Sequence, residues 1–358
     1  MPADQVTPNG YPGVLADLAA RFGDARGAVI GTSGPFRVSQ PEEDAFAALI
    51  GDWDPMHNDP AWRMAAGDGP IVLGFHVLAR VEQGLRSCPV IAGLARTVHA
   101  RTVGLDNVRF PAPFPVGALA SAEISISGVS FNEAGLALTT KHRYCVDGAS
   151  RPVMVAQLLT VVTARDGDDG GRQPGPFPLA SSDTAPVLIR ELPEGVPVPT
   201  SSRHDSAFYD ALPRRIGQWL GTTPWTCISD REAHAFALLT GDDGTNGHGD
   251  LPSRAHPFLS RGVPPLQLLA LRAYFSPLVG LPVLTDESMM AFNYGVDRAR
   301  WHGAVHTGTR LRDHVQLLGV QARRPGDHLV TTRHILEAEG SDHGALVADC
   351  KTLYRTSS

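Results

Sequence analysis

The spacing of the hydrophobic residues changes along this chain, and it predicts which segments are helices and which are strands. Around residues 74–87 large aliphatic side chains recur every three or four positions, which is the spacing of one face of an α-helix. They are Leu73, Val77, Leu78, Val81 and Leu85. The spacing predicts one long buried helix over residues 74–87.

The stretches that follow this helix have the pattern of strands. They carry β-branched and apolar runs, and turns rich in Gly and Pro, such as residues 111–117, separate them. The predicted strands are residues 97–110, 119–130, 136–145 and 153–162. The same order returns later, with a helix over residues 266–274 and strands at residues 289–301, 309–320, 329–336 and 345–354. Each half therefore predicts one helix covering an antiparallel sheet of about four or five strands, an α+β arrangement.

The recurrence extends to the residues themselves. Residues 39–52 (SQPEEDAFAALIGD) match residues 229–242 (SDREAHAFALLTGD) at a constant offset of 190 (39 to 229). Both segments open with the capping-box pattern Ser-x-x-Glu and end in Gly-Asp, which is typical of a short amphipathic helix. After one inserted residue the register continues at an offset of 191 (109 to 300), where Arg109 aligns with Arg300. We infer that the chain contains two copies of one unit.

Residues 166–187 are rich in Asp, Gly, Pro and Ser, a composition that cannot bury enough apolar surface to order a core element. We therefore expect an N-terminal unit at residues 1–165, a linker at residues 166–202 and a C-terminal unit at residues 203–358.

The composition excludes several classes of protein. The chain has 358 residues, of which 42% are hydrophobic and 19% charged, and its formal net charge of -6 argues against a nucleic acid or an anionic membrane as the main partner. The 4 cysteines form no Cys-x-x-Cys pair and the histidines show no ligand spacing, so no metal site is expected. No signal peptide or membrane-spanning stretch is recognised, and we expect a cytoplasmic protein.

The segment with the clearest chemistry is residues 51–61, where the carboxylate of Asp52 precedes the imidazole of His57 by five positions. Pro55 fixes its own φ and pushes Asp54 out of the helical region, so the chain turns between the two groups. Asp52 and His57 can then converge and move a proton. An ordinary turn with Asp59 as a helix N-cap fits the same residues.

Three segments together resemble the MaoC-like, or hydratase 2, branch of the hot-dog fold: residues 46–60 (FAALIGDWDPMHNDP), 69–74 (GPIVLG) and 107–113 (NVRFPAP). The resemblance implies a double hot-dog in which two units, each a long central helix wrapped by an antiparallel sheet, pair within a monomer or a homodimer. Members of the family add water to trans-2-enoyl thioesters of coenzyme A or acyl carrier protein, or dehydrate 3-hydroxyacyl thioesters. The resemblance implies no separate cofactor, because coenzyme A or the carrier's pantetheine is part of the substrate.

The family's catalytic Asp and His match Asp52 and His57, and the glycine that opens its buried helix matches Gly74. A backbone N–H of Gly74 in the first helical turn would bind the thioester carbonyl oxygen, since such donors have no partner in the helix and lie at its positive end. Two positions depart from the family: Asp54 stands where Asn is usual, and Leu73 where His is usual. We interpret Asp54 as a cap of the turn.

The missing histidine at position 73 puts substrate recognition in question. Either recognition differs, or another group such as His76 or His99 replaces it. The residues proposed to contact the substrate are Asp54, Leu73, His76, Asn107 and Arg109. The role proposed for Arg109 is contact with a phosphate or with pantetheine. It has the least support of these roles, because Arg300 repeats the residue in the second copy, which we expect to be inactive.

The second copy keeps Asp242 and His248, but its loop gains a residue, loses the proline and acquires two glycines. Pro265 replaces Gly74, and proline has no N–H to donate. We therefore predict that the first copy performs the chemistry, while the second completes a pseudo-dimer and shapes an acyl tunnel.

The expected activity is that of a hydro-lyase, an (R)-specific enoyl-CoA hydratase or 3-hydroxyacyl-thioester dehydratase of fatty acid or polyketide metabolism. Two alternatives are a hot-dog thioesterase and a non-catalytic subunit that binds acyl thioesters. The spacing of Asp52 and His57 favours the hydro-lyase. An acyl carrier protein is a possible partner, although the acidity of the chain mildly disfavours it.

Overall fold

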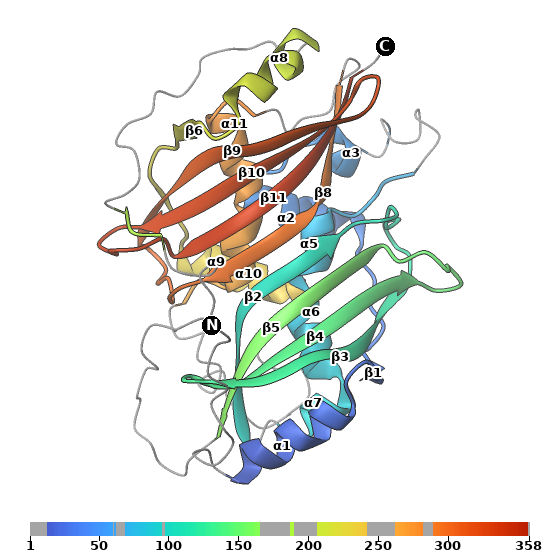
Figure 1. Ribbon diagram of the computed structural model, residues 1–358. Helices are drawn as coiled ribbons and strands as arrows, with labels where there is room; N and C mark the ends of the chain where they lie inside the picture. Colours follow the sequence, from blue (N-terminus) through green and yellow to red (C-terminus); the bar gives the residue numbers. More distant parts are fainter. Residues whose placement is uncertain are drawn as a thin grey trace.

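The computed structural model describes residues 13–59, 61, 69–94, 97–164, 187–189, 206–241, 262–281 and 289–356. Its strands form one continuous antiparallel sheet in the order β1-β3-β4-β5-β2-β8-β11-β10-β9-β6, with the short β7 paired to β9 (Figure 1). The first half supplies β1 (Val29–Thr32), β2 (Val98–Arg109), β3 (Ala120–Asn132), β4 (Gly135–Val146) and β5 (Met154–Ala164). The second half supplies β6 (Trp219–Thr222), β7 (Thr226–Cys227), β8 (Met289–Trp301), β9 (Arg310–Arg324), β10 (Asp327–Ala338) and β11 (Leu346–Thr356).

The strand order is nearly the same when read from either end, as a repeated unit requires. The four long strands predicted for each half are confirmed, and each half adds a short edge strand, β1 or β6, that the sequence pattern did not predict. Each of these strands has only four residues and contains a glycine, Gly31 or Gly221, which leaves too little alternation for a strand to be recognised.

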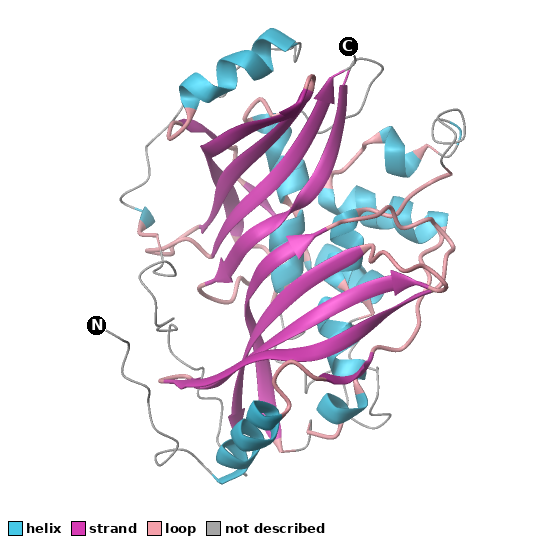
Figure 2. Ribbon diagram, turned by 45° about the vertical axis from the view of Figure 1, so that its right-hand side comes forward, coloured by secondary structure: helices cyan, strands magenta, loops and turns pink. Residues whose placement is uncertain are grey.

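The helices lie against one face of this sheet, which curves around them (Figure 2). The first half contains α1 (Gly13–Asp24), α2 (Gln40–Ile50), α3 (Pro55–Asn58), α5 (Gly74–Ala79), α6 (Val81–Ser87) and α7 (Pro89–Ala92). The second contains α8 (Ser206–Ala211), the 3-10 helix η4 (Leu212–Arg215), α9 (Asp230–Thr240), α10 (Pro265–Ala270) and α11 (Arg272–Leu278). One hydrophobic core joins the halves, because Phe46 and Leu78 belong to the same buried cluster as Phe236 and Leu269.

The predicted buried helix over residues 74–87 is present but divided. Arg80, at φ −85° and ψ 0°, separates α5 from α6, and Leu271 separates α10 from α11 at the matching place. In the first half the Tyr144 hydroxyl donates to the Arg80 carbonyl at 3.2 Å, and a Cβ on Gly84 would lie 2.4 Å from that hydroxyl oxygen. The tyrosine reaches the helix backbone because Gly84 leaves room for it. The Gly84 N–H still donates to the Arg80 carbonyl at 2.8 Å, and Leu271 divides the matching helix as well, so the break is a feature of the repeated fold.

The two short helices predicted from the capping boxes are confirmed as α2 and α9. The Glu42 carboxylate accepts from the Ser39 N–H at 2.7 Å, and Glu232 accepts from Ser229 at 2.8 Å. Gly51 ends α2 at φ 69°, and Gly241 ends α9 at φ 74°. Both are left-handed C-caps that favour glycine.

The two halves meet where β2 pairs with β8, in the centre of the sheet. Arg109 lies opposite Gly295, and Arg300 lies opposite Gly104, as the internal repeat requires. Two reciprocal ion pairs cross the seam. Arg109 pairs with Asp297, and Arg300 pairs with Asp106 at 2.8 Å.

Most of the predicted linker, residues 166–202, lies outside the described residues. The division of the chain into units at residues 1–165 and 203–358 therefore stays a prediction. Leu188, within the described segment 187–189, forms an isolated bridge with His343. Within the part of the chain that the structure describes, no helix has the length and apolarity needed to cross a bilayer.

Candidate active site

The loop after α2 has the turn that the sequence predicted. Asp52 follows the left-handed Gly51, and its N–H donates to the Ala47 carbonyl at 3.0 Å. The Asp54 carboxylate accepts from the Met56 N–H at 2.8 Å and so caps α3, whose first residue is Pro55. The capping role of Asp54 is therefore confirmed.

His57 lies on α3 in a fixed orientation. Its Nδ1 is 3.0 Å from the Ile71 carbonyl oxygen, and a carbonyl only accepts, so Nδ1 carries the hydrogen. In the neutral ring the lone pair is then on Nε2, which is the atom able to take a proton. Ile71 precedes Gly74 by three residues, so the same hydrogen bond ties the imidazole to the chain that enters α5.

Asp52, Asp54 and His57 line one small pocket, so the predicted convergence of the acid and the imidazole is present. The opposite wall comes from the second half, through α11, β8 and β11. The residues on that wall are Arg272, Ala273, Ala291, Asn293 and Thr352. The pocket therefore exists only because the two units pair.

Burial dominates the electrostatics of Asp52, whose exposed fraction is 4%. Loss of hydration raises the pKa of this carboxyl above its ordinary value, and Glu43 adds to the rise. His57, the Asp54 N–H at 3.2 Å and Arg272 oppose it, and the net direction is upward. A carboxyl with a raised pKa beside an imidazole is suited to acid and base work near neutral pH.

The start of α5 is held by a buried carboxylate that the sequence interpretation did not select. Glu43 accepts from the Leu73 N–H, and its Oε2 lies 2.7 Å from His76 Nδ1. Both Glu43 and His76 are fully buried. The internal repeat contained a clue, because Ala233 stands where Glu43 does and Gln267 where His76 does.

His76 is engaged away from the pocket. Its ring stacks on Phe46 with the ring centroids 4.1 Å apart, and its Nε2 is 3.3 Å from the Leu239 carbonyl oxygen. Leu73, the N-cap of α5, is also fully buried. Neither residue lines the described pocket, so their proposed contact with substrate has no support from this arrangement.

Gly74 is the first residue of α5, where a backbone N–H has no partner inside the helix. A Cβ at this position would lie 3.0 Å from three atoms of the Phe110 ring, so packing also favours glycine. Gly74 is not part of the described pocket lining, and its role as an oxyanion donor stays a prediction.

Asn107 and Arg109 lie on β2 outside the pocket lining. Asn107 has a positive φ of 54°, and its side chain donates to Gln157 Oε1 at 3.0 Å. Arg109 pairs with Asp297 and also donates to the Val108 carbonyl at 2.7 Å. Arg109 therefore contacts the second unit across the seam of the sheet, whereas Asn107 contacts β5 of its own unit. His99 lies on the same strand and is exposed.

The matching site of the second half is only partly described. Asp242 and His248 lie outside the described residues. Pro265 is the first residue of α10, as Gly74 is of α5, so the helix start without an N–H lies where the repeat predicted it.

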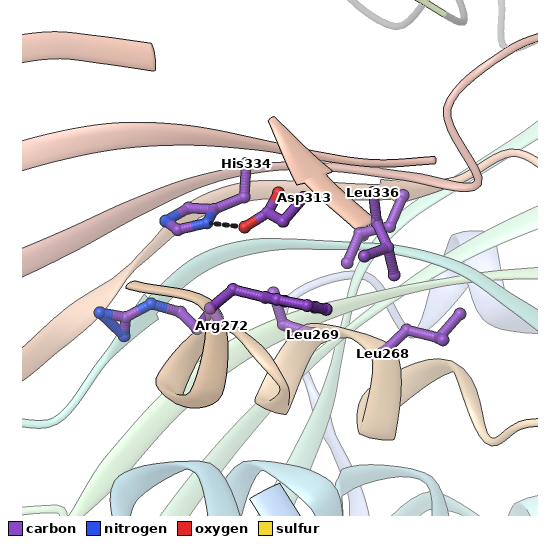
Figure 3. A pocket seen from close by; sticks show the side chains of 8 residues that line it. Leu268, Leu269, Arg272, Asp313, His334 and Leu336 are labelled. Atoms are coloured by element: carbon purple, nitrogen blue, oxygen red, sulfur yellow. Dashed lines mark hydrogen bonds and ion pairs between the residues drawn. The ribbon is translucent and has the colours of Figure 1, made fainter. Parts of the chain in front are cut away.

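A second pocket lies between α10, α11 and the sheet of the second half (Figure 3). Leucine side chains and Phe275 form much of its lining, and Arg272, which also lines the first pocket, borders it. His334 Nδ1 lies 2.6 Å from Asp313 Oδ2 in its wall. Across the described residues, no three His, Cys, Asp or Glu side chains gather as a metal site would require.

Comparisons with known proteins agree with this architecture. The chain is 34% identical over 148 residues to 3-hydroxyacyl-thioester dehydratase Z of Mycobacterium tuberculosis, which covers 40% of this chain and 93% of the relative. It is 32% identical over 155 residues to nodulation protein N of Rhizobium leguminosarum bv. viciae, covering 42% of this chain and 92% of that protein. No protein-family model matches the chain.

Two solved structures share the fold over almost the whole chain. One is described as a MaoC domain protein dehydratase from Chloroflexus aurantiacus, with a TM-score of 0.62 and 14% identity, covering 94% of this chain and 97% of that one. The other, a conserved hypothetical protein of Mycobacterium tuberculosis with a double hot-dog fold, has a TM-score of 0.61 and 15% identity, covering 93% and 98%. The shared fold and the 34% identical relative together show that this chain belongs to the MaoC-like family of hot-dog proteins, here as a double hot-dog.

Proposed function

We propose that this protein interconverts trans-2-enoyl thioesters and (R)-3-hydroxyacyl thioesters, with the chemistry in its first unit. The observation that carries the proposal is the pocket in which the buried Asp52 lies with His57, whose Nδ1–H is committed to the Ile71 carbonyl. In this proposal the Asp52 carboxyl and the His57 Nε2 act on the same small space.

In the hydration direction, water lies between Asp52 and His57. As its oxygen bonds to C3 of the substrate, this pair takes up one water proton and a proton is delivered to C2, so the double bond becomes a C–H and a C–OH bond. A positioned acid or base of this kind contributes about 10² to 10⁴-fold in rate. Dehydration is the same sequence reversed.

During either reaction negative charge grows on the thioester carbonyl oxygen. The N–H of Gly74 is the proposed donor to that oxygen, because it lies at the start of α5 and close in sequence to the Ile71 anchor of His57. One such donor is worth about 3 kcal/mol in the transition state.

The proposed substrates are thioesters of coenzyme A or of a carrier protein in cytoplasmic fatty acid or polyketide metabolism, with no further cofactor. The names of the relatives, 3-hydroxyacyl-thioester dehydratases among them, support this class. The second unit supplies the opposite wall of the pocket.

The test is a panel of C4 to C16 trans-2-enoyl-CoA substrates, followed by loss of enoyl absorbance, by free thiol release and by the chirality of the product. We expect absorbance loss without thiol release, and the (R)-3-hydroxyacyl product. Thiol release in step with turnover would instead identify a thioesterase. Ligand-induced stabilisation without turnover of any chain length would identify a binding subunit.

A further inference from the structure

Arg272 is the charged residue that the second unit contributes to the pocket of the first. It begins α11, its exposed fraction is 6%, and it lines the pocket opposite Asp52 and His57. We propose that Arg272 is a positioning residue of the active site, whose fixed guanidinium faces the Asp52 carboxyl across the pocket and supplies the opposite charge for it. This inference deepens the proposed function and rests on it for its catalytic meaning.

Neutral groups hold the guanidinium in place. Its Nη1 donates to Asn293 Oδ1 at 2.6 Å, and its Nη2 donates to Thr352 Oγ1 at 2.8 Å. The guanidinium carbon also lies 5.2 Å from the centroid of the Phe75 ring, which comes from the first unit. These contacts fix the position of the charge but do not neutralise it.

Within the described part of the chain, no carboxylate forms an ion pair with Arg272. Its Nε is buried and has no hydrogen-bond partner among these residues. A buried charge is costly unless an opposite charge compensates it. Asp52, which is equally buried and lines the same pocket, provides that compensation across the cavity.

The other charged groups around Asp52 belong to the first unit. His57 and Asp54 come from its own loop, and Glu43 comes from α2, where it opposes the ionisation of Asp52. Against the rise that burial causes, the charge of His57 lowers the pKa of Asp52 most, and Arg272 is the second charge that lowers it and comes from the other unit. On the far side of Arg272, Asp313 and His334 line the second pocket, where they pair with each other (Figure 3).

The internal repeat indicates that the fold does not need this arginine. Val81 is the residue at the matching position of the first unit (81 against 272), and it is buried in the hydrophobic core. An apolar residue is therefore compatible with the matching position in the helix of the first unit. Arg272 is the unusual choice, and it occurs in the unit that faces the intact Asp52 and His57 pair.

The experiment is a titration of the Asp52 carboxyl by ¹³C NMR in the full chain without substrate, with the signal assigned through Asp52→Asn. In Arg272→Gln we expect Asp52 to titrate at higher pH than in the wild type, whereas Arg272→Lys retains the charge and stays close to wild type. Arg80→Gln is the matched control, because it removes another buried arginine that is outside the pocket. An unchanged titration in Arg272→Gln, or an equal shift in Arg80→Gln, overturns the proposal.

Asn293→Asp keeps the proposal testable if Arg272→Gln does not fold. It places a carboxylate of nearly the same shape on Nη1, which diverts the charge of Arg272, so Asp52 should again titrate at higher pH. An unchanged titration contradicts the proposal. The acid limb of the pH profile of kcat/KM should move in the same direction in both variants. A shifted titration in a protein without hydro-lyase activity would reject the proposed function and leave the pairing of Arg272 with Asp52 intact.

Discussion

The two central helices begin with the same backbone and with different chemistry. The N-cap residues, Leu73 of α5 and Pro264 of α10, share φ −54° and ψ 131°. In the first unit the Leu73 N–H is bound by the buried Glu43, and Gly74 follows with a further N–H. In the second unit Pro264 and Pro265 offer no N–H at either position.

This difference separates what the fold requires from what the first unit adds. The second helix begins well without a buried carboxylate and without donors, because prolines are compatible with a first helical turn. The first helix retains a buried charge, which is costly to the folded state. The added carboxylate and donor are therefore features of the first unit that a helix start does not itself require.

The largest expected effect comes from the acid and the imidazole. Asp52→Asn and His57→Gln should each lower kcat/KM for an enoyl-CoA substrate by about 10² to 10⁴-fold, because each removes a proton-transferring group. The matched change in the second copy, Asp242→Asn, should leave turnover near wild type. If Asp242→Asn abolished turnover while Asp52→Asn did not, the assignment of the two units would be reversed.

Replacing Gly74 by the residue of the other unit tests the oxyanion donor. Gly74→Pro should lower kcat by about 10²-fold or more, as expected when one such donor is lost. Gly74→Ala keeps the N–H and adds the same Cβ against Phe110, so it controls for crowding. Steady-state kinetics of the pair measure the difference, and equal losses in both would assign the effect to packing alone.

Glu43→Ala copies Ala233 of the second unit and should destabilise the fold by about 3 kcal/mol, because it leaves the Leu73 N–H and the buried His76 without their acceptor. Urea unfolding measures this loss. Adding His76→Gln, which copies Gln267, should recover part of the stability. If the double variant recovered no stability, the loss in Glu43→Ala would not come from the unpaired His76.

The buried His142 should make the stability of the fold sensitive to acid. Burial lowers the pKa of His142 to about 3, and its Nδ1 has no partner among the described residues, whereas His334 at the matching place pairs with Asp313. Below the ordinary histidine pKa of about 6.5 the unfolded chain gains a proton that folded His142 excludes. Stability should therefore fall as pH drops from there toward about 3, at up to about 1.4 kcal/mol per pH unit.

The measurement is urea unfolding between pH 7 and pH 4 for the wild type and His142→Gln. The variant should show a smaller loss of stability on acidification. His306→Gln, at an exposed position, serves as the control and should follow the wild type. Identical slopes for the wild type and His142→Gln would assign the acid sensitivity to other groups.

The smallest effects are expected at the seam between the units. Arg300 is more buried than Arg109, with side-chain exposed fractions of 8% and 34%. Arg300→Met should destabilise the fold by about 1 to 3 kcal/mol because it leaves Asp106 unpaired, and Arg109→Met by about 0.5 kcal/mol because water screens its pair. Thermal unfolding of the two variants checks the order, and a larger effect at Arg109 would contradict it.

The sequence by itself determined the local elements and their repetition. The long strands, the capping boxes of α2 and α9, the left-handed glycines and the Asp54 turn all followed from nearby residues, because propensity, capping and turn geometry act over a few positions. The repeat also marked Pro265 as the position that lacks a donor. The breaks at Arg80 and Leu271 did not follow, because the helical spacing of apolar residues continues across the break at Arg80.

Only the tertiary structure decided which distant groups meet. Periodicity shows that a side chain is buried, but not which residue of another element it contacts. Glu43 under the start of α5, the ion pairs across β2 and β8, and Arg272 opposite Asp52 all join segments far apart in the chain. The acid and the imidazole of the site are local to one loop, whereas the charge that faces them comes from the other unit, because the pocket forms only where the two units pack together.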